Sequence, residues 1–193
     1  MPIGAGLGSG GSRPLRRKSP KITRPGKRQS SLTLRNDINA ALFTGAVSAA
    51  LLLGALGFQY LGGLAPCEMC IWQRWPHGAA ILIGVGGGLL VLSGLLPQSL
   101  SRALALFAIA AIIVSGGIGV FHAGVEWKLW PGPTACTGIG YVPGADDFKP
   151  LQIVRCDEAQ WRLLGISLAG YNAIISFAAA ALAVSLMGRA KAQ

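Results

Sequence analysis

Charged residues are scarce in this sequence of 193 residues. Asp, Glu, Lys and Arg together make up 12% of the chain, whereas hydrophobic residues make up 52%. Soluble globular domains carry about 25% charged residues, so the composition excludes an ordinary soluble protein. The positive mean hydropathy of +0.52 agrees with this exclusion.

Motifs of the common soluble enzymes are also absent. The sequence has no Gly-rich phosphate loop, no zinc-protease histidine pair, no serine elbow and no repeat of solenoid period. Only two histidines and four cysteines are present. Any chemistry is therefore sought first among these few side chains.

Acidic residues number seven against seventeen basic ones, which gives a formal net charge of +10. Such a charge can indicate nucleic-acid binding. Nine of the basic residues, however, lie within positions 1–35, among Gly, Ser and Pro. This segment cannot bury enough apolar surface to order itself, so we expect a disordered basic tail that signals membrane topology, and no nucleic-acid partner.

Four stretches contain no Asp, Glu, Lys or Arg, and each is long enough to cross a bilayer as a helix: 40–61, 76–96, 103–125 and 164–187. Because three more spans follow the first, a cleaved signal peptide is disfavoured for it. The sequence therefore predicts an all-α membrane protein, a bundle of four transmembrane helices spanning residues 36–187. Small residues such as those of Gly86–Gly88 and Gly116–Gly117 indicate close helix packing.

Lysine and arginine are distributed unequally between the two ends of such a bundle. The tail, the 97–102 turn and the short C-terminus at 188–193 share one end and hold twelve of them, while segments 62–75 and 126–163 hold five. The positive-inside rule then predicts cytoplasmic N- and C-termini. All four cysteines are expected in the two outer loops.

Cys67 and Cys70 form a C-x-x-C motif, and Cys136 and Cys156 lie in the longer outer loop. A disulfide across a two-residue gap is usually redox-labile. We therefore favour the pairs Cys67–Cys70 and Cys136–Cys156, and we expect no metal. A zinc site and two purely structural disulfides are the alternatives.

Three further polar residues lie close to these cysteines in the predicted topology. Arg74 follows the C-x-x-C motif and can stabilise a thiolate, or it can simply anchor the helix at the interface. His122 lies near the outer end of the third span, where an ionisable group is costly and suggests a function, although a helix–helix hydrogen bond would also explain it. His77 is a weaker candidate, because we expect it in the wet headgroup zone.

Three ordered segments of the chain resemble the disulfide bond formation protein B (DsbB) family of membrane oxidases. They read C-E-M-C-I-W-Q-R at 67–74, H-A-G-V-E-W-K-L-W-P-G-P-T-A-C at 122–136 and C-D-E-A-Q-W-R-L-L-G-I-S at 156–167. The resemblance covers about residues 36–187 and not the basic tail. The sequence departs from the family at Glu126, where some members have Gln, and in the shorter gap between the loop cysteines.

This resemblance implies a function and a site. The protein would be a dithiol:quinone oxidoreductase of the bacterial inner membrane that reoxidises a periplasmic DsbA-like thioredoxin-fold protein and passes the electrons to ubiquinone or menaquinone. Cys67 and Cys70 would form the pair next to the quinone, with Arg74 and His122 near the quinone. Cys136 and Cys156 would form the pair that meets the partner, Cys136 carrying the mixed disulfide.

Two other classes of protein remain to be distinguished. A vitamin K epoxide reductase-like oxidoreductase is also a small helical quinone user, but it would place its C-x-x-C motif on a later helix. A membrane protein without enzymatic activity could use the four cysteines as structural disulfides only. The latter predicts loss of stability when Cys67 is replaced, whereas an oxidase would lose turnover.

Overall fold

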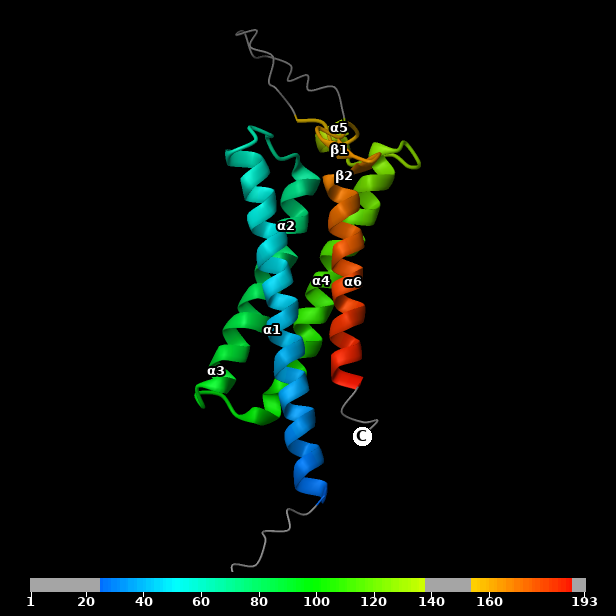
Figure 1. Cartoon of the computed structure of the whole chain (residues 1–193). Coiled ribbons are helices and arrows are strands. Elements are labelled where there is room, and N and C mark those ends of the chain that lie inside the picture. Colours follow the sequence, from blue (N-terminus) through cyan, green and yellow to red (C-terminus); the bar gives the residue numbers. More distant parts are fainter. Residues whose placement is uncertain (1–24, 138–153, 189–193) are drawn as a thin grey trace, which may run out of the picture.

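The computed structural model describes residues 25–137 and 154–188. Within these ranges, four helical segments run side by side along the molecule (Figure 1). Each is long and apolar enough to cross a membrane: Ser31–Tyr60, Glu68–Leu92, Gln98–Glu126 and Leu168–Gly188. The predicted all-α four-helix membrane fold is therefore confirmed. The 1–24 part of the expected basic tail lies outside the described residues.

The first segment is a single helix, α1, which extends over Pro25–Tyr60. The sequence prediction began this span at residue 40 and assigned residues up to 35 to the tail, so the helix begins earlier than expected. Proline is favoured at the first position of a helix, and each residue added to an existing helix gains a backbone hydrogen bond. The absence of an apolar pattern before residue 40 therefore did not mark the helix start.

The second segment consists of helix α2 (Glu68–Ile81), a π-helical turn η1 (Leu82–Gly87) and helix α3 (Gly88–Leu92). It starts eight residues before the predicted position 76, because Cys67 is the N-cap and accepts a hydrogen bond from the Cys70 backbone N–H. The C-x-x-C motif thus extends across the start of α2, with Cys67 as the N-cap and Cys70 in the first turn, and does not lie wholly in a loop as predicted. The segment ends at a turn in which Gly94 has φ +80°, a conformation that favours glycine.

The third segment is helix α4 (Ser101–Glu126), preceded by the short 3₁₀ turn η2 (Gln98–Leu100). A single helical turn, α5 (Thr134–Thr137), follows it. The fourth segment is helix α6 (Leu168–Gly188), four residues shorter at its start than predicted. A small antiparallel hairpin of β1 (Arg162–Leu163) and β2 (Ile166–Ser167) precedes it. Its turn residues Leu164 and Gly165 both have positive φ, as a two-residue hairpin turn of type I′ requires.

Helices α1 and α4 are in contact with each other, and each also contacts α2 and α6. Small residues allow the close packing. A Cβ atom added to Gly84 of η1 would collide with the carbonyl oxygen of Ala41 and lie 3.1 Å from the backbone N of Gly45, both on α1. Of the glycines singled out from sequence, Gly116 faces Ser176 on α6, whereas Gly86 and Gly117 face open space.

The outer surface of the bundle is apolar, as a lipid-facing surface should be. Large side chains on all four segments are exposed, among them Leu53, Leu82, Phe107 and Leu182. The start of α1 and the end of α6 lie at one end of the bundle, while α5 and the hairpin lie at the other (Figure 1). The bundle therefore places both described chain ends opposite the cysteines.

Candidate redox site

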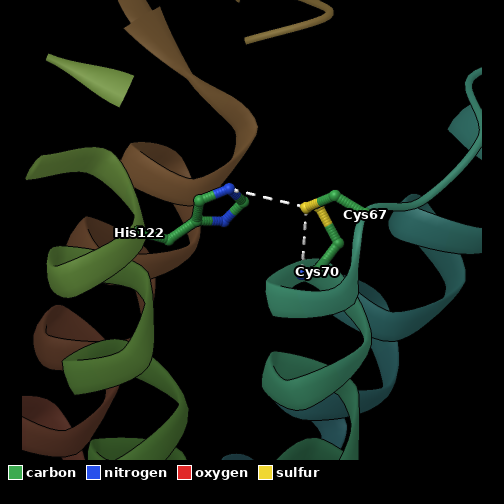
Figure 2. A group of neighbouring side chains, drawn as sticks. All are labelled: Cys67, Cys70 and His122. Carbon is green, nitrogen blue, oxygen red and sulfur yellow. Dashed lines mark hydrogen bonds between the residues drawn. The ribbon is translucent and has the colours of Figure 1, made fainter. Parts of the chain in front are cut away.

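Cys67 and Cys70 meet at the N-terminus of α2 (Figure 2). Both are free thiols in this structure, so the predicted Cys67–Cys70 disulfide is not formed here. The Cys67 thiol donates to the Cys70 sulfur over 2.9 Å. This hydrogen bond, together with burial, raises the pKa of the Cys67 thiol. Two sulfur atoms this close, in a local motif, form a reduced pair that can close to a disulfide with little movement.

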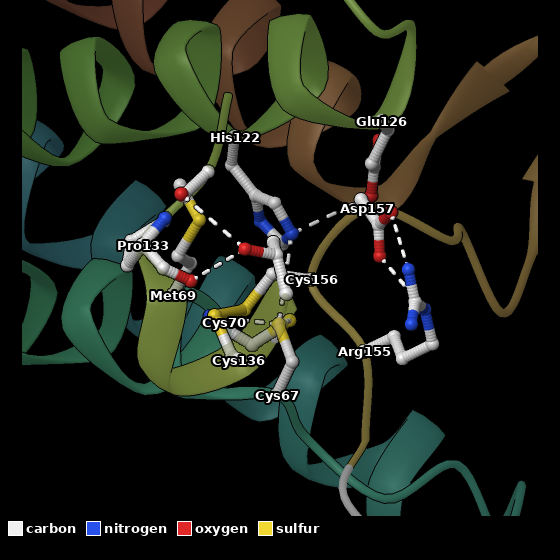
Figure 3. The surroundings of a disulfide bond; sticks show 12 residues. Cys67, Met69, Cys70, His122, Glu126, Pro133, Cys136, Arg155, Cys156 and Asp157 are labelled. Atoms are coloured by element: carbon white, nitrogen blue, oxygen red, sulfur yellow. Dashed lines mark hydrogen bonds and ion pairs between the residues drawn. A yellow bond between two sulfur atoms is a disulfide. The ribbon is translucent and has the colours of Figure 1, made fainter. Parts of the chain in front are cut away.

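Cys136 and Cys156 form a disulfide (Figure 3). Cys136 lies in the helical turn α5, and Cys156 lies where the described chain resumes after residue 153. The Cys156 backbone N–H donates to the Cys136 carbonyl oxygen over 3.0 Å. Both cysteines are almost fully buried. The loop that joins them lies almost entirely outside the described residues.

The disulfide and the thiol pair belong to one packed cluster. Cys67, Cys136 and Cys156 are buried together with Met69 of α2 and Val125 of α4, and Cys70 packs against this group. Cys67 is thus the more buried member of its pair and lies on the side of the disulfide. The fold brings together all four cysteines, although the first and the last are 89 positions apart in the sequence.

An ionic clamp holds the segment next to Cys156. Asp157 accepts hydrogen bonds from Arg155, at 2.8 and 3.0 Å, and from Lys128, which follows the end of α4. Arg155 and Lys128 lower the pKa of the Asp157 carboxyl to about 2. Because the folded pKa is depressed, the clamp contributes fully above the ordinary pKa of about 4 and is lost as the pH falls through about 2.

We predict that Asp157→Asn exposes the Cys136–Cys156 disulfide to reductants. The rate of reduction by a phosphine, which stays active in acid, should rise about two- to fivefold, since partly exposed ion pairs are weak. In the wild-type protein, titration of Asp157 should cause no change in the rate of disulfide reduction between pH 4 and 8. Glu158→Gln is the matched control, because Glu158 pairs with Arg155 at 3.2 Å and, within the described residues, makes no ion pair with Lys128. An equal acceleration in that control would contradict the role of Asp157.

His122 projects from α4 toward the thiol pair (Figure 2). Its Nε2 atom lies 3.6 Å from Cys67 Sγ and 3.6 Å from Glu126 Oε1, and its Nδ1 atom lies 2.9 Å from Gln73 Nε2. The imidazole also interacts with the backbone of Cys156. His122 therefore touches both cysteine pairs, and it is 2% exposed.

Sequence reasoning missed a buried polar network behind His122. Gln73 and His77 of α2, Ser115 of α4 and Asn172 of α6 are joined by hydrogen bonds of 2.7–3.2 Å. His77 is 3% exposed, so its predicted position in the wet headgroup zone is wrong. Its Nε2 atom lies 2.8 Å from Asn172 Oδ1 and 2.9 Å from Ser115 Oγ. The available signal was polar residues at helical spacing, such as Gln73 and His77, within otherwise apolar spans.

A cavity of about 360 Å³ lies next to the thiol pair. Its walls are mostly apolar and come from α1 and α6, and its polar lining includes both thiols, Arg74 and His122. Arg74 donates to Gln59 Oε1 over 2.6 Å, while its Nε atom is buried and has no hydrogen-bond partner among the described residues. Glu126 Oε2 is likewise buried with no partner in the described part of the chain, and Glu126 also lines the cavity.

The sulfur atoms of the thiol pair and a ring nitrogen of His122 lie within 4.8 Å of one another, close enough to bind a metal ion. The sulfur–sulfur separation of 2.9 Å is shorter than tetrahedral zinc coordination at about 2.3 Å per Zn–S bond requires. We therefore treat these atoms as a redox pair with a neighbouring histidine, and not as metal ligands. The sequence expectation of no metal stays a prediction.

The thiol pair packs against a disulfide at one end of a bundle of membrane-spanning helices. This arrangement is the one expected of a membrane protein that carries out thiol–disulfide exchange. The family model described as disulfide bond formation protein DsbB matches residues 37–186, and the chain belongs to this family. The predicted resemblance is thus confirmed. No solved structure matches the chain significantly.

Relatives of known name agree with this assignment. The chain is 32% identical over 137 residues to the disulfide bond formation protein B of Pasteurella multocida, a match that covers 66% of this chain and 74% of the relative. It is 29% identical over 159 residues to the protein of the same name from Aromatoleum aromaticum, covering 77% and 92%. The corresponding Azoarcus protein is 33% identical over 150 residues, covering 71% and 83%.

Family membership and the fold together establish the general function. The chain is a multi-pass bacterial membrane protein of disulfide bond formation, and the family name supports a disulfide-forming oxidoreductase. This result favours the oxidase over a vitamin K epoxide reductase-like enzyme and over a protein with structural disulfides alone.

Proposed function

We propose that the protein is a dithiol:quinone oxidoreductase that reoxidises a periplasmic DsbA-like thioredoxin-fold protein and passes the electrons to membrane quinone. One observation carries the proposal. The thiol pair lies between a buried disulfide on one side and a largely apolar cavity on the other. Electrons can therefore enter through one pair and leave through the other.

In the first step, a thiolate of the reduced partner attacks Cys136. The Cys136–Cys156 bond breaks, Cys156 leaves as a thiolate, and a mixed disulfide joins Cys136 to the partner. The second thiol of the partner then attacks the partner's other sulfur, the one joined to Cys136 in the mixed disulfide. The partner leaves as a disulfide, and its two electrons now reside on Cys136 and Cys156, which are a dithiol.

In the second step, the loop dithiol reduces a Cys67–Cys70 disulfide by the same exchange. We propose that a loop thiolate attacks the Cys67 sulfur of this disulfide, because Cys67 is buried in the cluster with both loop cysteines, while Cys70 only borders that cluster. Cys70 leaves first as a thiolate, and Cys67 leaves when the second loop thiol closes the loop disulfide. The pairing in this structure, with Cys67 and Cys70 reduced and Cys136–Cys156 oxidised, corresponds to the product of this step.

The residues around the cavity fit a quinone. Most of the lining from α1 and α6 is apolar, and both thiols, Arg74 and His122 are among the polar groups of the cavity. Arg74 Nε is a buried donor with no partner within residues 25–137 and 154–188, so a carbonyl oxygen placed there would satisfy it. When bound, a quinone would accept the two electrons and two protons that Cys67 and Cys70 release as they close to a disulfide. Arg74 would hold its oxygen and favour negative charge there.

The charge distribution supports an orientation in the bacterial inner membrane. The chain ends that the structure describes lie at the end of the bundle opposite the cysteines. Twelve of the seventeen lysines and arginines fall in the stretches of sequence that continue from or join the helices at that end, 1–35, 97–102 and 188–193. By the positive-inside rule, the N- and C-termini would be cytoplasmic. The thiol pair and the disulfide would then face the periplasm, where disulfides are formed.

The proposal is tested by anaerobic oxidation of a reduced periplasmic thioredoxin-fold dithiol protein. The purified membrane protein is mixed with this substrate and with ubiquinone or menaquinone, and the quinone absorbance is followed. We expect one quinone to be reduced for each partner molecule oxidised. If the folded protein supports no quinone reduction with either quinone, the proposed function is wrong.

We predict that Arg74→Ala impairs quinone use more than partner exchange. The loss of a donor aimed at the reacting oxygen should lower quinone reduction about 100-fold. Exchange between the partner and Cys136–Cys156, measured without quinone, should change less than about twofold. Arg35→Ala removes an equal charge at the other end of the bundle and serves as the control. An equal loss in both assays would contradict the role of Arg74.

A further inference from the structure

The network behind His122 determines which nitrogen of its ring carries the proton. The contacts of Asn172 determine which atoms of the network donate hydrogen bonds and which accept them. Its Nδ2 atom lies 3.2 Å from the backbone carbonyl oxygen of Ser115, which can only accept a hydrogen bond. The other end of the amide, Oδ1, faces the hydroxyl of Ser176 and the ring of His77, at 3.1 and 2.8 Å. Asn172 therefore presents an N–H donor toward α2.

Gln73 continues this chain of hydrogen bonds with the same donor-to-acceptor direction. Asn172 Nδ2 lies 2.7 Å from Gln73 Oε1, so Gln73 accepts at that atom. The opposite atom, Gln73 Nε2, lies 3.2 Å from the backbone carbonyl oxygen of Met69, and this second fixed acceptor requires an N–H donor there. Two carbonyl groups on different helices thus specify the same orientation of the Gln73 amide.

His122 is the last member of the chain of hydrogen bonds. Gln73 Nε2 donates to His122 Nδ1 over 2.9 Å, so Nδ1 accepts and the proton of the neutral ring lies on Nε2. Nε2 faces Cys67 Sγ at 3.6 Å (Figure 2). A hydrogen bond to a sulfur atom can form at this distance. The ring therefore offers Cys67 a donor, and it has no free lone pair on that side.

We propose that Asn172, acting through Gln73, is a positioning residue that holds the Nε2–H of His122 toward Cys67, where it stabilises that sulfur as a departing thiolate. The consequence for turnover rests on the proposed function, because Cys67 leaves as a thiolate when the loop disulfide closes. The positioning itself does not depend on the quinone or the partner. It explains why three helices bury amide and imidazole groups at a depth where each is costly.

Other charged and titratable groups surround Cys67, and they set the background for any measurement. They are Cys70 and Arg74 of α2, His122 and Glu126 of α4, and Arg162 of β1, which acts on Glu126. Glu126 Oε1 is as close to His122 Nε2 as Cys67 is, at 3.6 Å. The carboxylate and the thiolate therefore compete for one proton.

The tautomer is read directly from nitrogen NMR of the ¹⁵N-histidine-labelled reduced protein. The chain has only two histidines, so a His122→Ala sample assigns the signals. We expect His122 to be neutral with the proton on Nε2, and we expect Asn172→Leu to populate the other tautomer. A wild-type ring protonated on Nδ1, or on both nitrogens, at neutral pH would overturn the proposal. The test on the wild-type ring requires only the wild-type protein and the folded His122→Ala assignment sample, and not Asn172→Leu.

The consequence for Cys67 is measured in a Cys70→Ser background. With Cys136 and Cys156 joined, Cys67 is then the only free thiol, and its alkylation rate reports the thiolate fraction. Adding Asn172→Leu should slow alkylation at neutral pH about tenfold, which corresponds to a rise of about one pKa unit. Gln73→Leu should have the same effect, because it removes the donor to His122 itself.

Ser176→Ala is the matched control. Ser176 lies on α6 and donates to the same asparagine, but at Oδ1 and not at the atom that faces Gln73. It should leave the tautomer unchanged and the alkylation rate within about twofold. If Asn172→Leu and Gln73→Leu fold and alkylate at the background rate, the positioning role is wrong, whether or not the protein reduces quinone.

Discussion

Replacing Cys67 with serine is expected to stop quinone reduction while each protein molecule still oxidises one molecule of its partner. Serine cannot form a disulfide with Cys70, so the second pair is lost as an electron acceptor. The Cys136–Cys156 disulfide does not depend on Cys67 for its bond. It should therefore react once with the reduced partner and then remain a dithiol.

This prediction is tested by mixing the Cys67→Ser protein with excess reduced partner under anaerobic conditions. The expected result is a burst of one partner disulfide per protein molecule, followed by turnover more than about a thousandfold below wild type. Helix content by circular dichroism should be unchanged. A protein with structural disulfides alone would instead lose stability and show no burst. Continued turnover would mean that the electrons reach quinone without passing through Cys67.

The four spans could be predicted from sequence because lipid imposes a simple requirement, the absence of charge over about 20 residues. The ends of the helices could not, because they depend on local contacts. The second span begins at Glu68, since the Cys67 side chain caps it, and no hydropathy pattern contains that information. The fourth begins after the hairpin turn at Leu164 and Gly165, whose apolar sequence resembles the helix that follows.

The cysteines, Arg74 and His122 were found because their residue types are chemically unusual in an apolar chain. Gln73 and Asn172 were not found, because an amide has no reactivity of its own and its role depends on its neighbours. These two residues are 99 positions apart and meet only when α2 and α6 pack on α4. Glu126 was noted only as a departure from the family. Its buried position beside His122 required the folded structure.

Replacing Cys136 with serine is expected to have the converse effect of the Cys67 substitution. The partner then meets no disulfide that it can reach, so the single-turnover burst should disappear along with steady-state oxidation of the partner, again by more than about a thousandfold. Cys67 and Cys70 remain beside the cavity. They should still be oxidised by quinone, because that step does not require the loop pair.

The retained reaction is measured by supplying electrons from dithiothreitol in place of the protein partner. Cys70 is only partly buried, so a small dithiol should reduce the pair without help from Cys136. Quinone reduction driven by dithiothreitol should then stay within about tenfold of wild type in Cys136→Ser and vanish in Cys67→Ser. Loss of the dithiothreitol reaction in Cys136→Ser as well as in Cys67→Ser would contradict this prediction, because the loop disulfide would then be required for Cys67 and Cys70 either to accept electrons from a small dithiol or to pass them to quinone.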